Sequence, residues 1–210
     1  MKTFSFVILT AAFFTGPVMA KTTATIDPKA SNLTWEGKKV GGGHSGNLKA
    51  KSGTMEVDGV TLVGGTLVID MTSIEATDGK PKDNASLTGH LKADDFFGVE
   101  KHPDATIRIT SVKPNPASTN ENEVTGDLTI KGITKPVTFP ATLTATPDGH
   151  QVSGVVTVDR TNYDIKYKSG KFFPDLADKA IKDDFMVKFA VLAKAPSAAP
   201  AKTKKAKAKS

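Results

Sequence analysis

The sequence predicts an all-β protein in which eight or nine antiparallel strands form a small closed barrel or a sandwich. Apolar and polar residues alternate with a period of two along most of the chain, as in strands with one buried face. Pairs of turn residues separate the alternating runs, so neighbouring strands should run antiparallel. The chain contains no cysteine, and a hydrophobic core must therefore stabilise the fold without disulfides.

The first 20 residues have the features of a cleaved signal peptide. Lys2 precedes an apolar stretch at residues 4–14, which is shorter than the roughly 20 residues that a membrane-spanning helix needs. Gly16 and Pro17 end this stretch, and small residues before Lys21 suit a signal peptidase. We therefore expect an exported, soluble protein that begins at Lys21.

Nine segments of the mature chain are predicted strands. The alternation is clear at residues 105–112, where Ala105, Ile107 and Ile109 share one face and polar residues occupy the other. In chain order, the predicted strands cover residues 22–26, 32–36, 45–57, 60–71, 105–112, 124–131, 137–144, 151–158 and 185–191.

Tight turns are predicted at residues 58–59, 131–132 and 147–149, which read Asp-Gly, Lys-Gly and Pro-Asp-Gly. If the strands close into a barrel of eight, its interior is just wide enough for its own side chains or for one small ligand. The question of whether the interior is filled or hollow therefore decides between a structural and a binding role.

Two short helices are expected to plug or flank the strands. The first would be capped by Asp83 or Asn84, run through Leu87, Leu91 and Phe96, and end before Gly98. The second is predicted at residues 174–181, where Pro174 suits a first helical turn and Asp175 suits the positive end of the helix dipole.

The charge distribution separates a folded body, residues 21–193, from a tail, residues 194–210. Of the 28 Lys and Arg residues, Lys2 and six tail lysines lie outside the body, so the remaining 21 nearly balance the 22 acidic residues. A nucleic-acid-binding face is therefore not predicted. The tail consists of Ala, Pro, Lys, Ser and Thr, and we expect it to be disordered, either as a solvated tether or in weak contact with an anionic envelope or membrane surface.

No motif points to catalysis or to a metal. Residues 41–46 match GxGxxG, but the following segment reads as extended, so a glycine-rich bend is expected rather than a nucleotide site. His90 and Asp94 are four residues apart, which is typical of an ordinary polar pair on a helix. We predict no catalytic residue, no metal and no cofactor.

Several separated motifs give the chain a resemblance to the YceI-like family. They are WEGK at residues 35–38, GHSG at 43–46, DMTSI at 70–74, GHLKADDFFGVEKHPDA at 89–105, VTGDLTIKGITKPV at 124–137, DRTNYDI at 159–165 and DDF at 183–185. The resemblance extends from about residue 26 to residue 192, and the Lys/Ala-rich tail lies outside it.

The resemblance implies an eight-stranded, lipocalin-like antiparallel barrel in the bacterial periplasm. It also implies a non-enzymatic protein that holds a polyisoprenoid, an isoprenoid quinone or a fatty-acyl amide in the barrel lumen, in transport, storage or a stress response. The expected lumen residues are apolar members of alternating faces: Trp35, Leu67, Ile69, Ile107, Leu128, Ile130, Phe139, Leu143, Phe185 and Phe189.

Two other functions stay open at this point. A lipid-modifying enzyme could use the same barrel, with Tyr163, Asp164 or His90 as acid or base. Alternatively, the chain is a structural, envelope-associated β-domain whose core is filled by its own side chains. The sequence leaves open the ligand, the role of the tail, which face of each strand is inward, and whether the protein is a homodimer.

Overall fold

The structure is a computed structural model that describes residues 21–115, 118 and 121–194. The predicted signal peptide at residues 1–20 and residues 195–210 of the predicted tail lie outside this range. Lys194, which we expected to begin the tail, is instead the last residue of the final strand. It pairs with Thr25 in the first strand, and its ammonium group lies 2.6 Å from Asp27.

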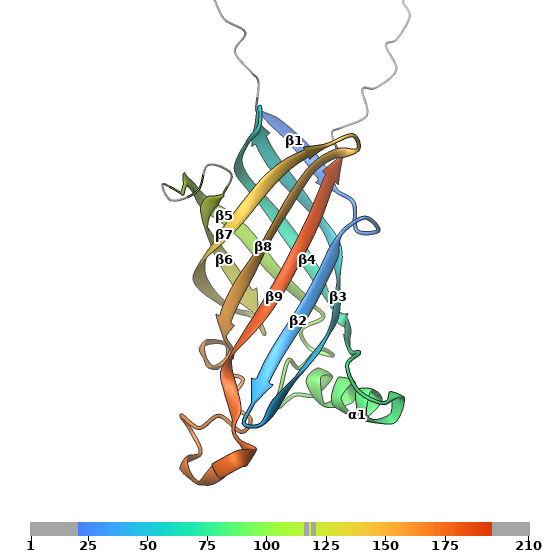
Figure 1. Cartoon of the computed structure of the whole chain (residues 1–210), viewed down its shortest axis with the longest axis vertical. Coiled ribbons are helices and arrows are strands. Elements are labelled where there is room, and N and C mark those ends of the chain that lie inside the picture. Colours follow the sequence, from blue (N-terminus) through green and yellow to red (C-terminus); the bar gives the residue numbers. More distant parts are fainter. Residues whose placement is uncertain (1–20, 116–117, 119–120, 195–210) are drawn as a thin grey trace, which may run out of the picture.

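Nine antiparallel strands form one sheet that closes on itself (Figure 1). The strands are β1 (Thr22–Ile26), β2 (Asn32–Lys39), β3 (Gly42–Asp58), β4 (Thr61–Ala76), β5 (Asp104–Pro114), β6 (Asn122–Ile130), β7 (Ile133–Thr146), β8 (Gly149–Asp159) and β9 (Ile181–Lys194). Strands β2 to β9 make a closed eight-stranded barrel, because β2 pairs with both β3 and β9 and β3 also pairs with β4. The predicted barrel is thus confirmed over the sandwich.

Strand β1 is additional to the eight barrel strands and lies in the barrel wall between β3 and β9, beyond the residues of these strands that pair with β2. It pairs with β3 along most of its length and with the last residues of β9. The side chains around it are tightly packed, since Ala24 and Ala193 are fully buried and Val57 is 2% exposed. Strand β1 is therefore packed as part of the hydrophobic core.

The strand register brings predicted inward residues into continuous rows. Leu67 in β4 lies opposite Ile107 in β5, and Ile107 lies opposite Leu128 in β6. Phe189 in β9 lies opposite Leu33 in β2 on one side and opposite Gly154 in β8 on the other. A side chain at Gly154 would collide with the Phe189 ring at 2.8 Å, so glycine is required where this ring crosses β8.

The predicted tight turns are present. Lys131 and Gly132 both have positive φ, 50° and 73°, as expected for the two central residues of a type I′ hairpin between β6 and β7. Gly59 has φ of 60° between β3 and β4. The glycine-rich segment that matched GxGxxG contains the turn between β2 and β3, where Gly41 has φ of 77°.

The first predicted helix is shorter and starts earlier than expected. Helix α1 spans Pro81–Lys92, with Lys80 as its N-cap, so neither Asp83 nor Asn84 caps it. Pro81 fixes the backbone for the first turn, and the Asn84 side chain exchanges two hydrogen bonds with the backbone of Gly79. Phe96 lies beyond the helix, in the loop that leads to β5.

The second predicted helix is wrong in type and extent. Residues Pro174–Lys179 form an irregular 3-10 segment, η2, in which Ala177 has a non-helical backbone with φ of 48°. Ile181 belongs to β9, because its N–H donates to the carbonyl of Lys168 at 2.9 Å and the residue pairs with Lys39. Residues 174–180 alone are too few to gain from helix cooperativity.

Candidate functional site: the barrel interior

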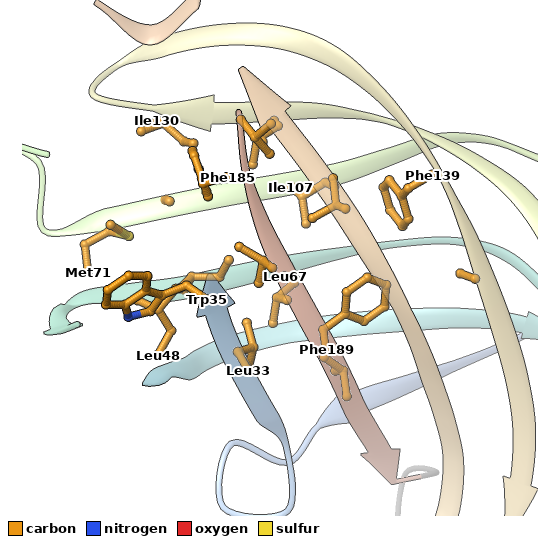
Figure 2. A pocket seen from close by; sticks show the side chains of 18 of the residues that line it. Leu33, Trp35, Leu48, Leu67, Met71, Ile107, Ile130, Phe139, Phe185 and Phe189 are labelled. Carbon is orange, nitrogen blue, oxygen red and sulfur yellow. The ribbon is translucent and has the colours of Figure 1, made fainter. Parts of the chain in front are cut away.

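A cavity of about 190 Å³ lies inside the barrel, and its wall consists almost entirely of apolar atoms. Figure 2 shows side chains from facing strands pointing into this common space. Those labelled come from β2 (Leu33, Trp35), β3 (Leu48), β4 (Leu67, Met71), β5 (Ile107), β6 (Ile130), β7 (Phe139) and β9 (Phe185, Phe189). An apolar cavity of about 150 Å³ is known to stay dry and to accept small apolar molecules.

Several of the inward-facing side chains in the barrel are only partly buried. Leu67, Ile107 and Phe189 line the cavity but fall short of full burial. Because these partly buried side chains point inward, their uncovered surface faces the cavity (Figure 2). The interior is therefore hollow, which argues against a barrel filled by its own side chains.

Nine of the ten predicted lumen residues line this cavity, and Leu143 does not. The nine are Trp35, Leu67, Ile69, Ile107, Leu128, Ile130, Phe139, Phe185 and Phe189. Leu143 has the same inward parity on β7 as Phe139 and Ala141, but it lies further along the strand, where it packs partly buried against the core. Alternation therefore predicted the correct face for Leu143, but it does not predict how far along the barrel axis the cavity extends.

Several lining residues were not among the predicted ones. Val187 and Val191 share the β9 face with Phe185 and Phe189, so the same alternation would have included them. Leu91, Phe96 and Phe97 come from the end of α1 and the loop after it. The remaining apolar lining residues from the strands include Ile26, Leu33, Leu48, Met55, Leu62, Met71, Ile74, Ala105, Ile109, Val124, Ala141, Val152, Val156 and Val158.

A cluster of aromatic rings lies at the α1 end of the barrel. Phe97 meets Phe185 edge to face with ring centroids 6.0 Å apart, and it meets Phe96 at 5.3 Å. Beside them, the Trp35 indole N–H donates to the carbonyl of Glu75 at 3.0 Å. A side chain at Gly46 would come within 2.8 Å of Trp35 Nε1 and would also collide with the Glu75 carbonyl, so glycine is required where these strands approach.

Arg160 lies against this aromatic cluster and is 2% exposed. Its guanidinium carbon is 5.9 Å from the centre of the Phe96 ring. Its N–H groups donate, at 2.9–3.4 Å, to the carbonyl oxygens of Ile165, Tyr167, Ile181 and Lys182 and to Oδ1 of Asp183. Burial lowers the pKa of Arg160, while the charge of Asp183 opposes that change. The guanidinium stays protonated in proteins, so this is a fully hydrogen-bonded buried cation.

The start of β9 bulges away from β2 next to Arg160. Gly37 pairs with Phe185, whereas Lys39 pairs with Ile181, so three residues of β9 stand opposite one residue of β2. Such a bulge displaces backbone groups from the regular ladder of hydrogen bonds. The carbonyl of Lys182 lies in the bulge and is one of those that Arg160 binds.

At this bulge the cavity lining extends to residues that are exposed on the outside of the barrel. Lys182 and Asp184 line the cavity although both residues are exposed to solvent. Gly37 lines it from the opposite strand, and a Cβ there would meet nothing closer than 3.9 Å. The bulge is therefore the place where charged, solvent-exposed residues enter the cavity lining.

The residues considered for catalysis do not line the cavity. Asp164 is exposed and pairs with Lys166 at 2.7 Å. His90 Nε2 lies 3.2 Å from Asp95. We expected His90 and Asp94 to form a pair on one helix, but the helix ends at Lys92, before Asp94. Within the described part of the chain, no group of three or more His, Cys, Asp or Glu side chains is arranged to hold a metal ion. No helix in that part is long and apolar enough to cross a membrane.

Tyr163 is 1% exposed, and its hydroxyl has no hydrogen-bond partner among the described residues. Burial raises the pKa of Tyr163 to about 12. A phenol with this pKa is neutral at physiological pH, and a buried hydroxyl without a partner costs stability. The arrangement is that of a core residue rather than of an acid or base.

Replacing Tyr163 with phenylalanine should leave the protein at least as stable at pH 7, because the change removes an unpaired buried hydroxyl. Compared with this variant, the wild-type protein should lose a further amount of unfolding free energy, about 1.4 kcal/mol per pH unit above the ordinary tyrosine pKa near 10, because only the unfolded chain then ionises Tyr163. This additional loss should end near pH 12, where Tyr163 ionises in the folded protein as well. Urea unfolding at pH 7 and pH 11 measures both effects, and Tyr167→Phe is the control. Equal pH dependence in the wild type and in Tyr163→Phe would contradict the assignment of Tyr163 as a buried residue with a raised pKa.

Comparison with known proteins identifies relatives for most of the described chain. The family model of the YceI-like domain matches residues 25–193. UPF0312 protein SA2479 of Staphylococcus aureus is 40% identical over 91 residues, which cover 40% of this chain and 49% of that protein. Protein YceI of Escherichia coli is 39% identical over 77 residues, which cover 37% of this chain and 36% of that protein. The chain thus spans about half or less of the length of these curated relatives.

Two solved structures share the fold. BcnA of Burkholderia cenocepacia superposes with a TM-score of 0.61 at 22% identity, over 79% of this chain and 98% of that one. A polyisoprenoid binding domain from Saccharophagus degradans, implicated in plant cell wall breakdown, superposes with a TM-score of 0.58 at 14% identity, over 84% of this chain and 100% of that one. At these identities the likeness concerns the barrel architecture.

Proposed function

Since the chain belongs to the YceI-like family, we propose that its barrel binds and sequesters a long apolar molecule in the lumen. The observation that carries the proposal is the hollow interior: inward apolar side chains keep uncovered surface around a cavity of about 190 Å³. The ligand classes that suit such a lumen are polyisoprenoids, isoprenoid quinones and fatty-acyl amides. The role is transport, storage or a stress response.

The binding energy in this mechanism comes from removing hydrocarbon from water. Burial of apolar surface is worth about 25 cal/mol per Å², so covering roughly 400 Å² of a chain contributes about 10 kcal/mol before association entropy is subtracted. The polar groups near the bulge, Lys182 and Asp184, stand where a ligand head group would meet the wall. They orient the ligand, and the apolar wall holds it.

A ligand-binding rather than a catalytic role is supported by the chemistry of the wall. Ionisable residues enter the cavity lining at Arg160, Lys182 and Asp184, all close to the bulge. The Arg160 donors are all used by protein acceptors, which leaves none to polarise a substrate. We place the protein in the bacterial periplasm, on the basis of the signal-like residues 1–20, and we assign the lysine-rich tail a weak contact with the envelope.

Extraction of the purified protein with organic solvent, followed by mass spectrometry, tests the proposal. A lipid-soluble molecule should be recovered in a fixed ratio to protein, and native mass spectra should show the complex. After the ligand is stripped, octaprenyl alcohol at 100 times its dissociation constant should raise the unfolding free energy by about 2.7 kcal/mol. If spectra show apo protein alone and no apolar chain changes the stability, the proposal is wrong.

A further inference from the structure

Two aromatic side chains at one end of the barrel are exposed. Phe172 is 42% exposed and Phe173 is 47% exposed, and they lie in the loop between β8 and β9. This loop protrudes at the α1 end of the barrel (Figure 1). Large apolar side chains gathered at one exposed place on a protein commonly mark a surface for a partner or a membrane.

The loop presents these rings from a fixed support. Ser169 is fully buried, and its carbonyl accepts hydrogen bonds from the N–H groups of Phe172 and Phe173 at 3.1 and 3.0 Å. The Ser169 hydroxyl also accepts from the N–H of Lys171 at 3.2 Å. Ser169 itself pairs with Ile181 at the start of β9. The exposed rings are therefore attached to the barrel wall by backbone hydrogen bonds.

Lysines surround the exposed rings. The ammonium groups of Lys166 and Lys171 lie 5.3 and 6.0 Å from the centre of the Phe172 ring, and that of Lys168 lies 5.3 Å from the Tyr167 ring. Residues 166–173 contain no acidic residue. Lys166 pairs with Asp164, whereas Lys168 and Lys171 form no ion pair with any carboxylate in the described part of the chain.

The same end of the barrel carries a further exposed apolar residue and the bulge at the start of β9. Val40, in the turn between β2 and β3, is 50% exposed, and its N–H donates to the carbonyl of Ala180 at 3.2 Å. The next residues along β9 are those of the bulge, where Lys182 and Asp184 line the cavity. An apolar and cationic surface thus adjoins the bulge, where exposed residues line the cavity.

We propose that this surface, the basic-aromatic patch formed by Val40, Lys166, Lys168, Lys171, Phe172 and Phe173, docks the barrel onto an anionic lipid bilayer. Aromatic side chains partition into the interfacial region of a membrane, and lysines beside them are attracted to anionic head groups. This pairing of apolar and cationic groups complements a bilayer surface in both polarity and charge. Docking does not depend on an occupied lumen; its purpose, the exchange of an apolar ligand with the bilayer, rests on the function proposed above.

The rings should contribute more to docking than the lysines do. Asp175 and Asp178 follow the patch on η2 and offset part of its positive charge. Removing the rings should therefore weaken docking on anionic vesicles at any salt concentration. Removing the lysines should weaken it mainly at low salt, where exposed charges are least screened.

Vesicle co-sedimentation with the mature chain, residues 21–210, tests the proposal. Vesicles of phosphatidylglycerol and phosphatidylcholine are compared with vesicles of phosphatidylcholine alone. Phe172→Ser combined with Phe173→Ser should reduce partitioning onto the anionic vesicles by about tenfold or more, and Lys168→Gln with Lys171→Gln by several-fold at low salt. The lysines of residues 195–210 are identical in every variant, so any binding through them is a constant background.

Val60 and Val63 supply the matched control, because they are 78% and 38% exposed in and beside the turn between β3 and β4. Val60→Ser combined with Val63→Ser should bind vesicles like the wild type. Equal loss in the control, or wild-type binding by the Phe172 and Phe173 double variant, would overturn the proposal. Circular dichroism confirms folding, and the lysine variant gives an independent answer if the aromatic variant unfolds.

Uptake of a fluorescent polyene fatty acid, measured without vesicles, separates docking from lumen binding. The aromatic double variant should take up this probe as the wild type does and should lose only its transfer from vesicles. Wild-type protein that docks but takes up no probe would refute the lumen function and leave docking intact. Wild-type protein that takes up the probe but ignores anionic vesicles would refute docking alone.

Discussion

Replacing Arg160 with methionine should lower the free energy of unfolding by about 3–5 kcal/mol, although the change is isosteric enough to leave no large cavity. Arg160 is 2% exposed, and its guanidinium is surrounded by backbone carbonyls from two segments, residues 165–167 and 181–182. Without it, these acceptors stay buried without donors, and Asp183 loses its partner. Each such group carries its own desolvation cost.

Urea unfolding of Arg160→Met and Arg160→Lys measures the effect, with Arg108→Met as the matched control. Arg108 also pairs with an aspartate, Asp127 at 2.8 Å, but its side chain is 68% exposed. An exposed pair of this kind contributes about 0–1 kcal/mol, so the control should stay close to wild type. Lysine should recover only part of the loss, because one ammonium group cannot reach both segments. Similar stabilities for Arg160→Met and Arg108→Met would show that Arg160 does not hold the bulge.

The strands and the faces they present followed from alternation, whereas the strand ends did not. We predicted a strand at residues 60–71, but β4 continues to Ala76 through a polar stretch. That stretch stays in the sheet because Glu75 is held by its neighbours: its carbonyl accepts from the Trp35 indole and its carboxylate from Asn47. A partner strand that already extends this far imposes strand structure on residues with little preference for it.

Nine lumen residues could be predicted because they lie on regular strands, where side-chain direction follows from position. The height of each residue along the barrel depends on register, which is why Leu143 was placed wrongly. Phe96 and Phe97 enter the cavity wall from a loop, and no periodic pattern places a loop residue. Arg160 is part of the DRTNYDI motif, but charged side chains are rarely buried unless they are paired. Its burial could therefore not be predicted without knowing which carbonyl oxygens accept its hydrogen bonds.

The bulge between β2 and β9 also lay beyond the sequence pattern. Lys182, Asp183 and Asp184 read as a polar start to the last strand, and no residue in them demands an extra, unpaired stretch. Arg160, more than 20 residues earlier, donates to the carbonyl oxygens of Ile181 and Lys182 at this bulge. Local alternation therefore predicted the barrel strands, whereas the contacts made at the bulge come from a residue far away in the sequence.

Replacing Ile107 with aspartate should reduce binding of an apolar ligand by about 100-fold or more. Ile107 lies in the centre of the inward row formed with Leu67 and Leu128, and it lines the cavity. A carboxylate there must keep water or become protonated, and either state makes the lumen less favourable for hydrocarbon. Binding is measured by titration with a fluorescent polyene fatty acid and by solvent extraction of the purified protein.

The adjacent residue provides a control that differs only in the direction of its side chain. Thr106 is on the outer face of the same strand, so Thr106→Asp should bind the fatty acid within about twofold of wild type, although it introduces the same charge. Ile107→Trp is a second test that adds no charge: its ring would occupy part of the 190 Å³ cavity and should also reduce uptake. If Ile107→Asp, Ile107→Trp and Thr106→Asp all bind alike, the ligand lies outside the lumen, and the exposed basic-aromatic patch becomes the place to look for it. If the two lumen variants fail and the outward one does not, binding depends on the empty apolar interior.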